Sequence, residues 1–104
     1  MGIIKGILEE ELKRLEELSV FYKKKILDYP QGSVSVKERG GKRYIYLARR
    51  EDKKVVFDYI GKDVPDIRKA LNEKLKQRKE YQAKLRQVKE NLREVERSFR
   101  GKRT

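Results

Sequence analysis

Apolar side chains recur at steps of four and three from residue 3 to residue 29, which predicts a long amphipathic helix. The stripe consists of Leu8, Leu12, Leu15, Tyr22, Ile26 and Tyr29, with Ser19 in its one polar place, and Ile4, Leu18 and Phe21 widen it. Lysines near the end of this segment suit the negative end of the helix dipole. Pro30 and Gly32 follow at once and are expected to end the helix.

Between residues 33 and 61 the apolar period changes from helical spacing to alternation, which predicts strands. Gly40-Gly41 is a two-residue hairpin signal, because both glycines can adopt positive φ. Residues 51–53 make a second turn, and Gly61 ends the last strand. We therefore expect a three-stranded antiparallel meander.

Helical spacing returns after residue 62 and continues to about Phe99. Asp63 is the expected N-cap, and Pro65 in the first turn sacrifices no hydrogen bond. Ile67, Leu71 and Leu75 lead into a seam that alternates steps of four and three, as in a heptad repeat. That seam consists of Tyr81, Leu85, Val88, Leu92, Val95 and Phe99.

These elements predict an α+β protein of order α-β-β-β-α and a single domain over residues 1–104. Helix 3–29 and helix 63–99 would form an antiparallel coiled-coil hairpin with the sheet of residues 33–61 inserted between them, and residues 100–104 would form a basic tail. The second helix is longer by about two turns. We expect a homodimer, formed through the seams of both helices, to bury the surplus.

Alternation assigns the faces of the sheet only in part. Val34 and Val36 are expected to face inward on the first strand. Either Ile45 and Leu47 or the set Tyr44, Tyr46 and Ala48 is buried on the second strand, and both alternatives stay open. Asp58 on the third strand argues for solvent on its own side, so the inward set there is predicted to be Val55, Phe57 and Tyr59. Because both faces have apolar content, one is expected to be covered by helix and the other to be available to a partner.

The chain is strongly basic, with 29 Lys and Arg against 17 Asp and Glu and a formal charge of +12. Residues 1–30 are neutral, whereas residues 31–62 carry +5 and residues 63–104 carry +7. A positive field of this density attracts polyanions and favours contact with phosphates. The sheet and the second helix are therefore the expected binding region.

Composition also excludes several kinds of chemistry. The chain contains no Cys and no His, which excludes disulfides, thiolate metal sites and triads built on His. No acidic cluster has the spacing of a metal site, and we expect no catalytic residues, metal, cofactor or small-molecule substrate. No signal peptide and no membrane span is predicted, so a soluble, cytoplasmic protein is expected.

Basic residues alternate with aromatic ones through the sheet, and two more bases follow at the start of the second helix. The candidate nucleic-acid-binding residues are Lys37, Arg39, Lys42, Arg43, Tyr44, Tyr46, Arg49, Arg50, Lys54, Arg68 and Lys69. A basic ribbon of this kind can enter a major groove, or its tyrosines can stack on unpaired bases. The structural alternative is that the aromatics pack against the helices and the bases only keep the sheet edges soluble.

Three stretches of the sheet region carry a resemblance, namely PQGSV (30–34), GKRYIYL (41–47) and KVVFDYIGK (54–62). They resemble small uncharacterised prokaryotic proteins with a GSxV…GKxYxYL…YIG meander and a charged C-terminal helix. They are also similar to three-stranded DNA-binding segments of transposases and integrases. The second resemblance implies that Lys37, Arg39, Arg43 and Arg49 face a DNA groove, and it implies no strand-transfer activity, because no recombinase catalytic domain is present.

The resulting hypothesis is a non-enzymatic accessory or regulatory protein that binds nucleic acid, DNA rather than RNA, through the basic sheet and helix. Two alternatives remain open. One is a coiled-coil interaction or scaffold module whose charge is incidental, and the other is an RNA-binding protein.

Overall fold

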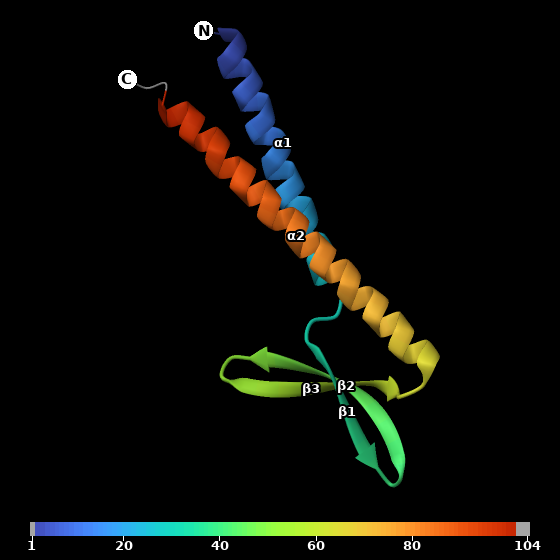
Figure 1. The fold of residues 1–104 in the computed structure, drawn as a ribbon. Helices are drawn as coiled ribbons and strands as arrows, with labels where there is room; N and C mark the ends of the chain where they lie inside the picture. Colours follow the sequence, from blue (N-terminus) through green and yellow to red (C-terminus); the bar gives the residue numbers. More distant parts are fainter. Residues whose placement is uncertain (1, 102–104) are drawn as a thin grey trace. The chain divides into compact units, whose positions relative to one another are not determined.

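The computed structural model describes residues 2–101 of the chain, and Figure 1 shows the order of its elements. Helix α1 spans Gly2–Leu27 and helix α2 spans Pro65–Gly101. Strands β1 (Ser33–Arg39), β2 (Lys42–Glu51) and β3 (Lys54–Lys62) lie between them. The predicted α+β class and the order α-β-β-β-α are confirmed.

The chain divides into two compact units, and α2 contributes to both. The first, the helix-pair unit, consists of the chain before Tyr29 and the chain after Arg78. The second, the sheet unit, is Tyr29–Arg78. The expectation of a single domain stays a prediction. No helix within residues 2–101 combines the length and the apolar character that a bilayer span requires.

In the helix-pair unit, α1 and the second part of α2 run antiparallel, so that the beginning of α1 and the end of α2 lie at the same end (Figure 1). Leu15 and Ser19 of α1 and Val88 of α2 are buried there. The ring of Tyr22 lies 6.1 Å from that of Tyr81. The predicted seams therefore face each other, with the small Ser19 in the place that sequence periodicity left polar.

The buried stripe of α1 is narrower than the sequence suggested. Ile4 and Phe21 were expected to widen it, but both are exposed. One partner helix covers only a narrow band of another helix, so the flanking apolar positions stay in solvent.

In the sheet unit, β2 is the central strand and pairs antiparallel with both neighbours. Gly40 and Gly41 have φ of 58° and 77°, which confirms the predicted two-residue turn. Asp52 at the second turn has φ 55°. Gly32 precedes β1 with φ 132°, and a Cβ there would lie 2.5 Å from the backbone oxygen of Ala48, so only glycine fits.

The first turns of α2 cover one face of the sheet. Ile45 and Leu47 of β2 are 0% and 2% exposed and form a core with Leu71, against which Ile67 and Leu75 pack. Gly61 allows this approach, since a Cβ at that position would lie 3.2 Å from the Ile67 side chain. The surplus apolar length of α2 thus has a partner within the chain. The homodimer stays a prediction, but the surplus length of α2 no longer supports it, because the sheet covers that surplus.

The start of α2 differs from the prediction in one respect. Asp63 was expected to be the N-cap, but the first helical hydrogen bond runs from the Arg68 amide to the Val64 carbonyl, so that Val64 holds the cap position. The Asp63 carboxylate instead accepts two hydrogen bonds from the Arg68 guanidinium, at 2.9 and 2.8 Å. The Asp63 carboxylate therefore binds the Arg68 guanidinium and not the free backbone amides of the first turn of α2.

Candidate nucleic-acid interface

Strand register divides the side chains of the sheet between two faces. Residues that pair directly across strands share a face, so Ile45 defines the face that α2 covers, and Tyr46 defines the other, which we call the open face. Tyr46 pairs with Ser35 on one side and Tyr59 on the other. The alternative in which Ile45 and Leu47 are the buried set of β2 is therefore the one observed.

The third strand contradicts the prediction made for it. Val55, Phe57 and Tyr59 were expected to be buried, but they lie on the open face and are all exposed, Phe57 by 44% and Tyr59 by 58%. Asp58 lies on the covered face, where its carboxylate accepts a hydrogen bond of 2.6 Å from Nε of Arg49. An ion pair across the strands satisfies the charge that was assumed to need solvent.

The open face carries a cluster of four aromatic rings, which we call the aromatic cluster: Tyr44, Tyr46, Phe57 and Tyr59. The Tyr59 ring lies 5.5 Å from that of Tyr46 and 6.2 Å from that of Tyr44. The Lys37 ammonium lies 3.6 Å from the centroid of Phe57 and 5.1 Å from that of Tyr46. Within the sheet unit no helix covers this face, so ring surface and cation reach solvent together.

The charges of the strands separate by face in the same way. The open face has five basic residues and no acidic one, namely Lys37, Arg39, Lys42, Arg50 and Lys62. The covered face has three basic and three acidic residues, namely Arg43, Arg49, Lys54, Glu38, Glu51 and Asp58. Alternate positions of one sheet thus produce a neutral face and a face of charge +5.

On the covered face, Arg49 has two carboxylate partners. Arg49 contacts Asp58 and also Glu51, whose carboxylate lies 3.2 Å from Nη1. These carboxylates, Asp58 above all, raise the pKa of Arg49 above its ordinary value. Its guanidinium is therefore less available to a ligand.

The predicted site residues thus fall into three groups. Lys37, Arg39, Lys42, Tyr44, Tyr46 and Arg50 come together on the open face, whereas Arg43, Arg49 and Lys54 lie on the opposite one. Arg68 and Lys69 line a shallow groove on the first turns of α2 with Lys76, and Arg68 is paired with Asp63. The four groove-facing residues that the integrase likeness implies, Lys37, Arg39, Arg43 and Arg49, therefore do not share a face.

Three aromatic or basic residues of the open face were missing from the predicted site: Phe57, Tyr59 and Lys62. Cross-strand aromatic pairing of β3 with Tyr44 and Tyr46 was the available signal for the first two. No feature of the sequence indicated the face of Lys62, because an irregularity of register opposite Ile45 and Tyr46 determines its direction.

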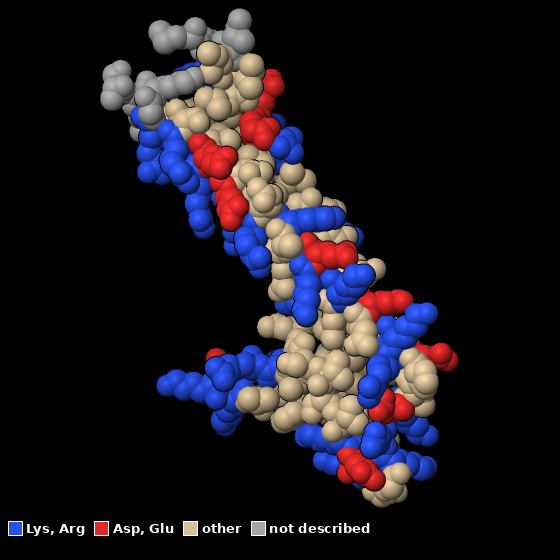
Figure 2. Space-filling model, in the orientation of Figure 1, with Lys and Arg blue, Asp and Glu red and all other residues tan. Residues whose placement is uncertain are grey.

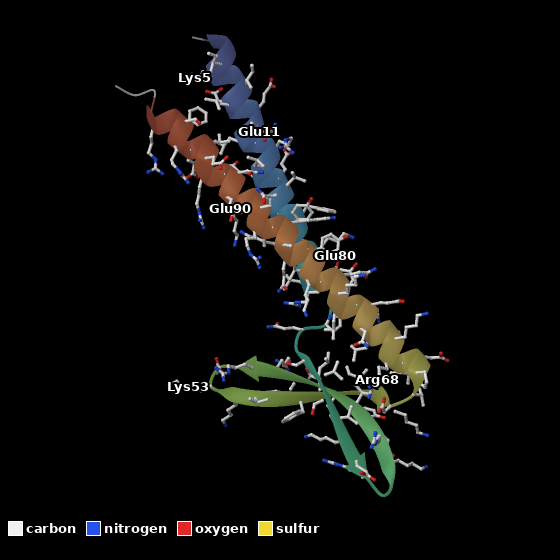
Figure 3. The ribbon with its side chains drawn as sticks, viewed as in Figure 1. Lys5, Glu11, Lys53, Arg68, Glu80 and Glu90 are labelled. Carbon is white, nitrogen blue, oxygen red and sulfur yellow. The ribbon has the colours of Figure 1, made fainter. Side chains whose placement is uncertain are left out.

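Figure 2 shows Lys and Arg side chains gathered around the two hairpin turns of the sheet unit, with uncharged residues between them. Figure 3 places Lys53 at the tip of the β2–β3 turn and Arg68 at the start of α2. Residues 2–101 contain no group of three or more acidic side chains placed to hold a metal ion.

Comparison with known proteins identifies a family. The profile of a domain of unknown function, DUF6788, matches residues 4–69, which is more than half of the chain. The chain belongs to the DUF6788 family. The matched segment of this DUF6788 protein contains α1, the whole sheet and the first residues of α2, and with them every member of the open face. No curated protein and no solved structure matches the sequence. The likeness to transposase and integrase segments stays a prediction.

Proposed function

We propose that this DUF6788 protein is a non-enzymatic, cytoplasmic accessory or regulatory protein that binds nucleic acid through the open face of its sheet. The observation that carries the proposal is that the aromatic cluster, with Phe57 and Tyr59 exposed and Tyr44 and Tyr46 half-buried, lies on the one face where basic residues stand without acidic ones. Rings offer stacking surfaces to bases, and the five cations offer contacts to phosphates.

The ion pairs of the sheet unit support this choice of face. Arg49 and Arg68 are held by carboxylates, whereas the structure gives none of the five open-face cations an acidic partner among the described residues. A cation without a carboxylate partner gains most from a phosphate. Arg49 on the covered face and Arg68 at the start of α2 are therefore expected to contribute less.

A protein-interaction module is the second candidate. Its support is the apolar surface of α1 outside the seam, where Ile7, Val20 and Leu27 are all more than half exposed. These side chains do not form one continuous stripe on the helix, and residues 1–30, which include α1, have no net positive charge to share in the first candidate's binding. The two functions are thus carried by different units of the chain.

The test is binding to duplex DNA, single-stranded DNA and RNA across a salt series. Nucleic-acid binding through the open face predicts that log affinity falls linearly with log salt, by about 0.7 per phosphate contacted on a single strand and about 0.9 on a duplex. The variant pair Lys37→Glu with Arg39→Glu is expected to abolish most of this binding.

The matched control is Lys23→Glu with Lys24→Glu, which changes the net charge equally but on α1. It is expected to retain most of the affinity. Absence of binding to all three nucleic acids at low salt would reject the proposal and favour the interaction module. Equal losses in the two variant pairs would mean that the net charge, and not the open face, governs binding.

A further inference from the structure

The open face is apolar at its centre and charged at its margins. Tyr46, Ala48, Phe57 and Tyr59 form the centre across β2 and β3, with Val55 beside Phe57. Arg39 and Lys42 stand at one turn, and Arg50 stands toward the other. A ligand on this face thus meets rings and methyl groups, with Lys37 over two of the rings, and further cations at the edges.

This arrangement discriminates between kinds of nucleic acid. In a duplex, neighbouring base pairs cover the faces of each base, so the rings of the aromatic cluster would have no stacking partner. Groove readers also need Arg, Lys, Asn or Gln free to reach base edges, and the one such side chain at the centre here, Lys37, lies over the rings of Phe57 and Tyr46. Unpaired bases present the flat apolar surface that these rings match.

The position of Lys37 fits the same ligand. Its ammonium lies over the rings of Phe57 and Tyr46, at the centre of an otherwise apolar surface. A base that stacks on Phe57 would displace this ammonium from the ring and leave it beside the phosphate of the same nucleotide. The lysine exchanges a cation–π contact for a charge-assisted one.

Two aliphatic side chains of the open face affect how a sugar would be bound. Ala48 pairs with Phe57, and Val55 lies beyond Phe57, opposite Arg50, and both supply methyl groups. A ribose whose 2′-hydroxyl faces these methyl groups would lose hydration there, whereas deoxyribose has no such group to desolvate.

We infer that the occupant of the open face is an unpaired stretch of single-stranded DNA, whose bases stack on Tyr46, Phe57 and Tyr59 while Lys37 and the marginal cations hold its phosphates. This inference rests on the proposed function and narrows it to one class of ligand. Charge complementarity and the rings favour an unpaired strand, and the methyl groups of Ala48 and Val55 favour deoxyribose over ribose.

The first experiment uses the unaltered protein and labelled probes of about ten nucleotides, a length within the range that a small stacking surface covers. Fluorescence anisotropy compares oligo(dT), its duplex with oligo(dA), an abasic strand with the same phosphates, and oligo(U). Because stacking contributes per base, oligo(dT) is expected to bind roughly 5- to 150-fold more tightly than the abasic strand for each base engaged. The duplex and the oligo(U) strand are expected to bind more weakly than oligo(dT).

The second experiment removes the rings. Phe57→Leu and Tyr59→Leu keep apolar side chains on exposed positions and are expected to lose about 5- to 150-fold in affinity for oligo(dT), without a change in salt slope or in binding to the abasic strand. The matched control is Phe21→Leu on α1, which is also half-exposed and also lies under a lysine, with Lys25 Nζ 5.7 Å from its ring. This control is expected to bind like the unaltered protein.

Each contrary result has a distinct meaning. Equal affinity for oligo(dT), the abasic strand and the duplex would overturn the inference and leave the proposed function standing. Binding of oligo(U) as tight as that of oligo(dT), or tighter, would overturn the choice of DNA. Failure to bind any probe would reject the proposed function itself. The probe series involves no substitution, so it tests the inference even if a variant does not fold.

Discussion

The two faces of the sheet are built from alternate residues of the same strands, yet they have different chemistry. The covered face places aliphatic Ile45 and Leu47 under α2 and balances its charges, with Arg49 paired to Asp58. The open face places aromatic rings and unbalanced cations toward solvent. The difference indicates that hydrophobicity alone does not mark a core, because both faces have it. Charge balance and the kind of apolar side chain distinguish the face that holds the fold from the face available to a ligand.

The largest expected effect comes from truncating the covered face. Ile45→Ala leaves a cavity beneath α2 at a fully buried position. It is expected to lower the free energy of unfolding by about 2–5 kcal/mol. Tyr59→Leu on the open face is expected to change it by about 0.5 kcal/mol or less, because more than half of the ring is already in solvent. Urea denaturation followed by circular dichroism measures both, and equal losses would contradict the assignment of the faces.

A second effect lies at the entry to the sheet, where Gly32 approaches β2. Gly32→Ala places a Cβ against the backbone oxygen of Ala48 and retains a φ that L-residues rarely adopt. We expect a loss of about 1–3 kcal/mol in the free energy of unfolding. Gly6→Ala on α1 is the control, since a Cβ there meets nothing within 4 Å, and it is expected to leave stability unchanged or raise it slightly. A loss in the control as large as that at Gly32 would argue against the backbone contact as its cause.

A third effect separates the cations of the two faces. Lys37→Gln with Arg39→Gln removes two charges from the open face, and Arg43→Gln with Lys54→Gln removes two from the covered face. If the first pair contacts phosphates and the second does not, only the first lowers the salt slope for single-stranded DNA, by about 1.4. Anisotropy titrations at several salt concentrations measure the slopes. A loss of slope in the second pair as large as in the first would show that both faces contact phosphate.

The smallest effect lies outside the sheet and concerns pH. A hydrogen bond from Arg14 lowers the pKa of Glu11 below its ordinary value of 4.5. A lowered pKa in the folded state stabilises the protein above the unfolded value, and this contribution is lost as the pH falls through the folded one. Glu11→Gln is therefore expected to reduce slightly the fall in stability below pH 4.5, as followed by thermal melts, and to leave nucleic-acid binding unchanged. An unchanged pH profile would mean that the exposed pair contributes nothing measurable.

The elements of this fold were predictable because each rests on local information. Periodicity located both helices and the three strands, and Gly40-Gly41 fixed a turn that only positive φ allows. The candidate site was predictable only as a region. Which face Tyr59 and Asp58 occupy depends on the register between strands and on the ion pair with Arg49, nine residues away. From the sequence alone, Asp58 was expected on the solvent side of its strand. The ion pair with Arg49 explains why it lies on the covered face instead.

The N-terminal part of α2 is a second case in which the sequence predicted an element but not its tertiary contacts. The sequence showed that the second helix is longer than the first but not what covers the surplus, and a second copy of the chain was the expected partner. In the structure Ile67, Leu71 and Leu75, in the part of α2 nearest the sheet, pack against the sheet instead. Periodicity predicts that an apolar stripe must be buried, and tertiary contacts decide against what.

The open face, and not the covered face or the helices, is proposed to bind a single DNA strand. The most direct test is an NMR titration of the protein with oligo(dT), in which the ring signals of Tyr46, Phe57 and Tyr59 are followed with the methyl signals of Ile45 and Leu47. We expect large, saturable shifts of the three rings and small shifts of the methyl groups. Shifts confined to the helices, or rings that stay unperturbed while the DNA binds, would contradict the account.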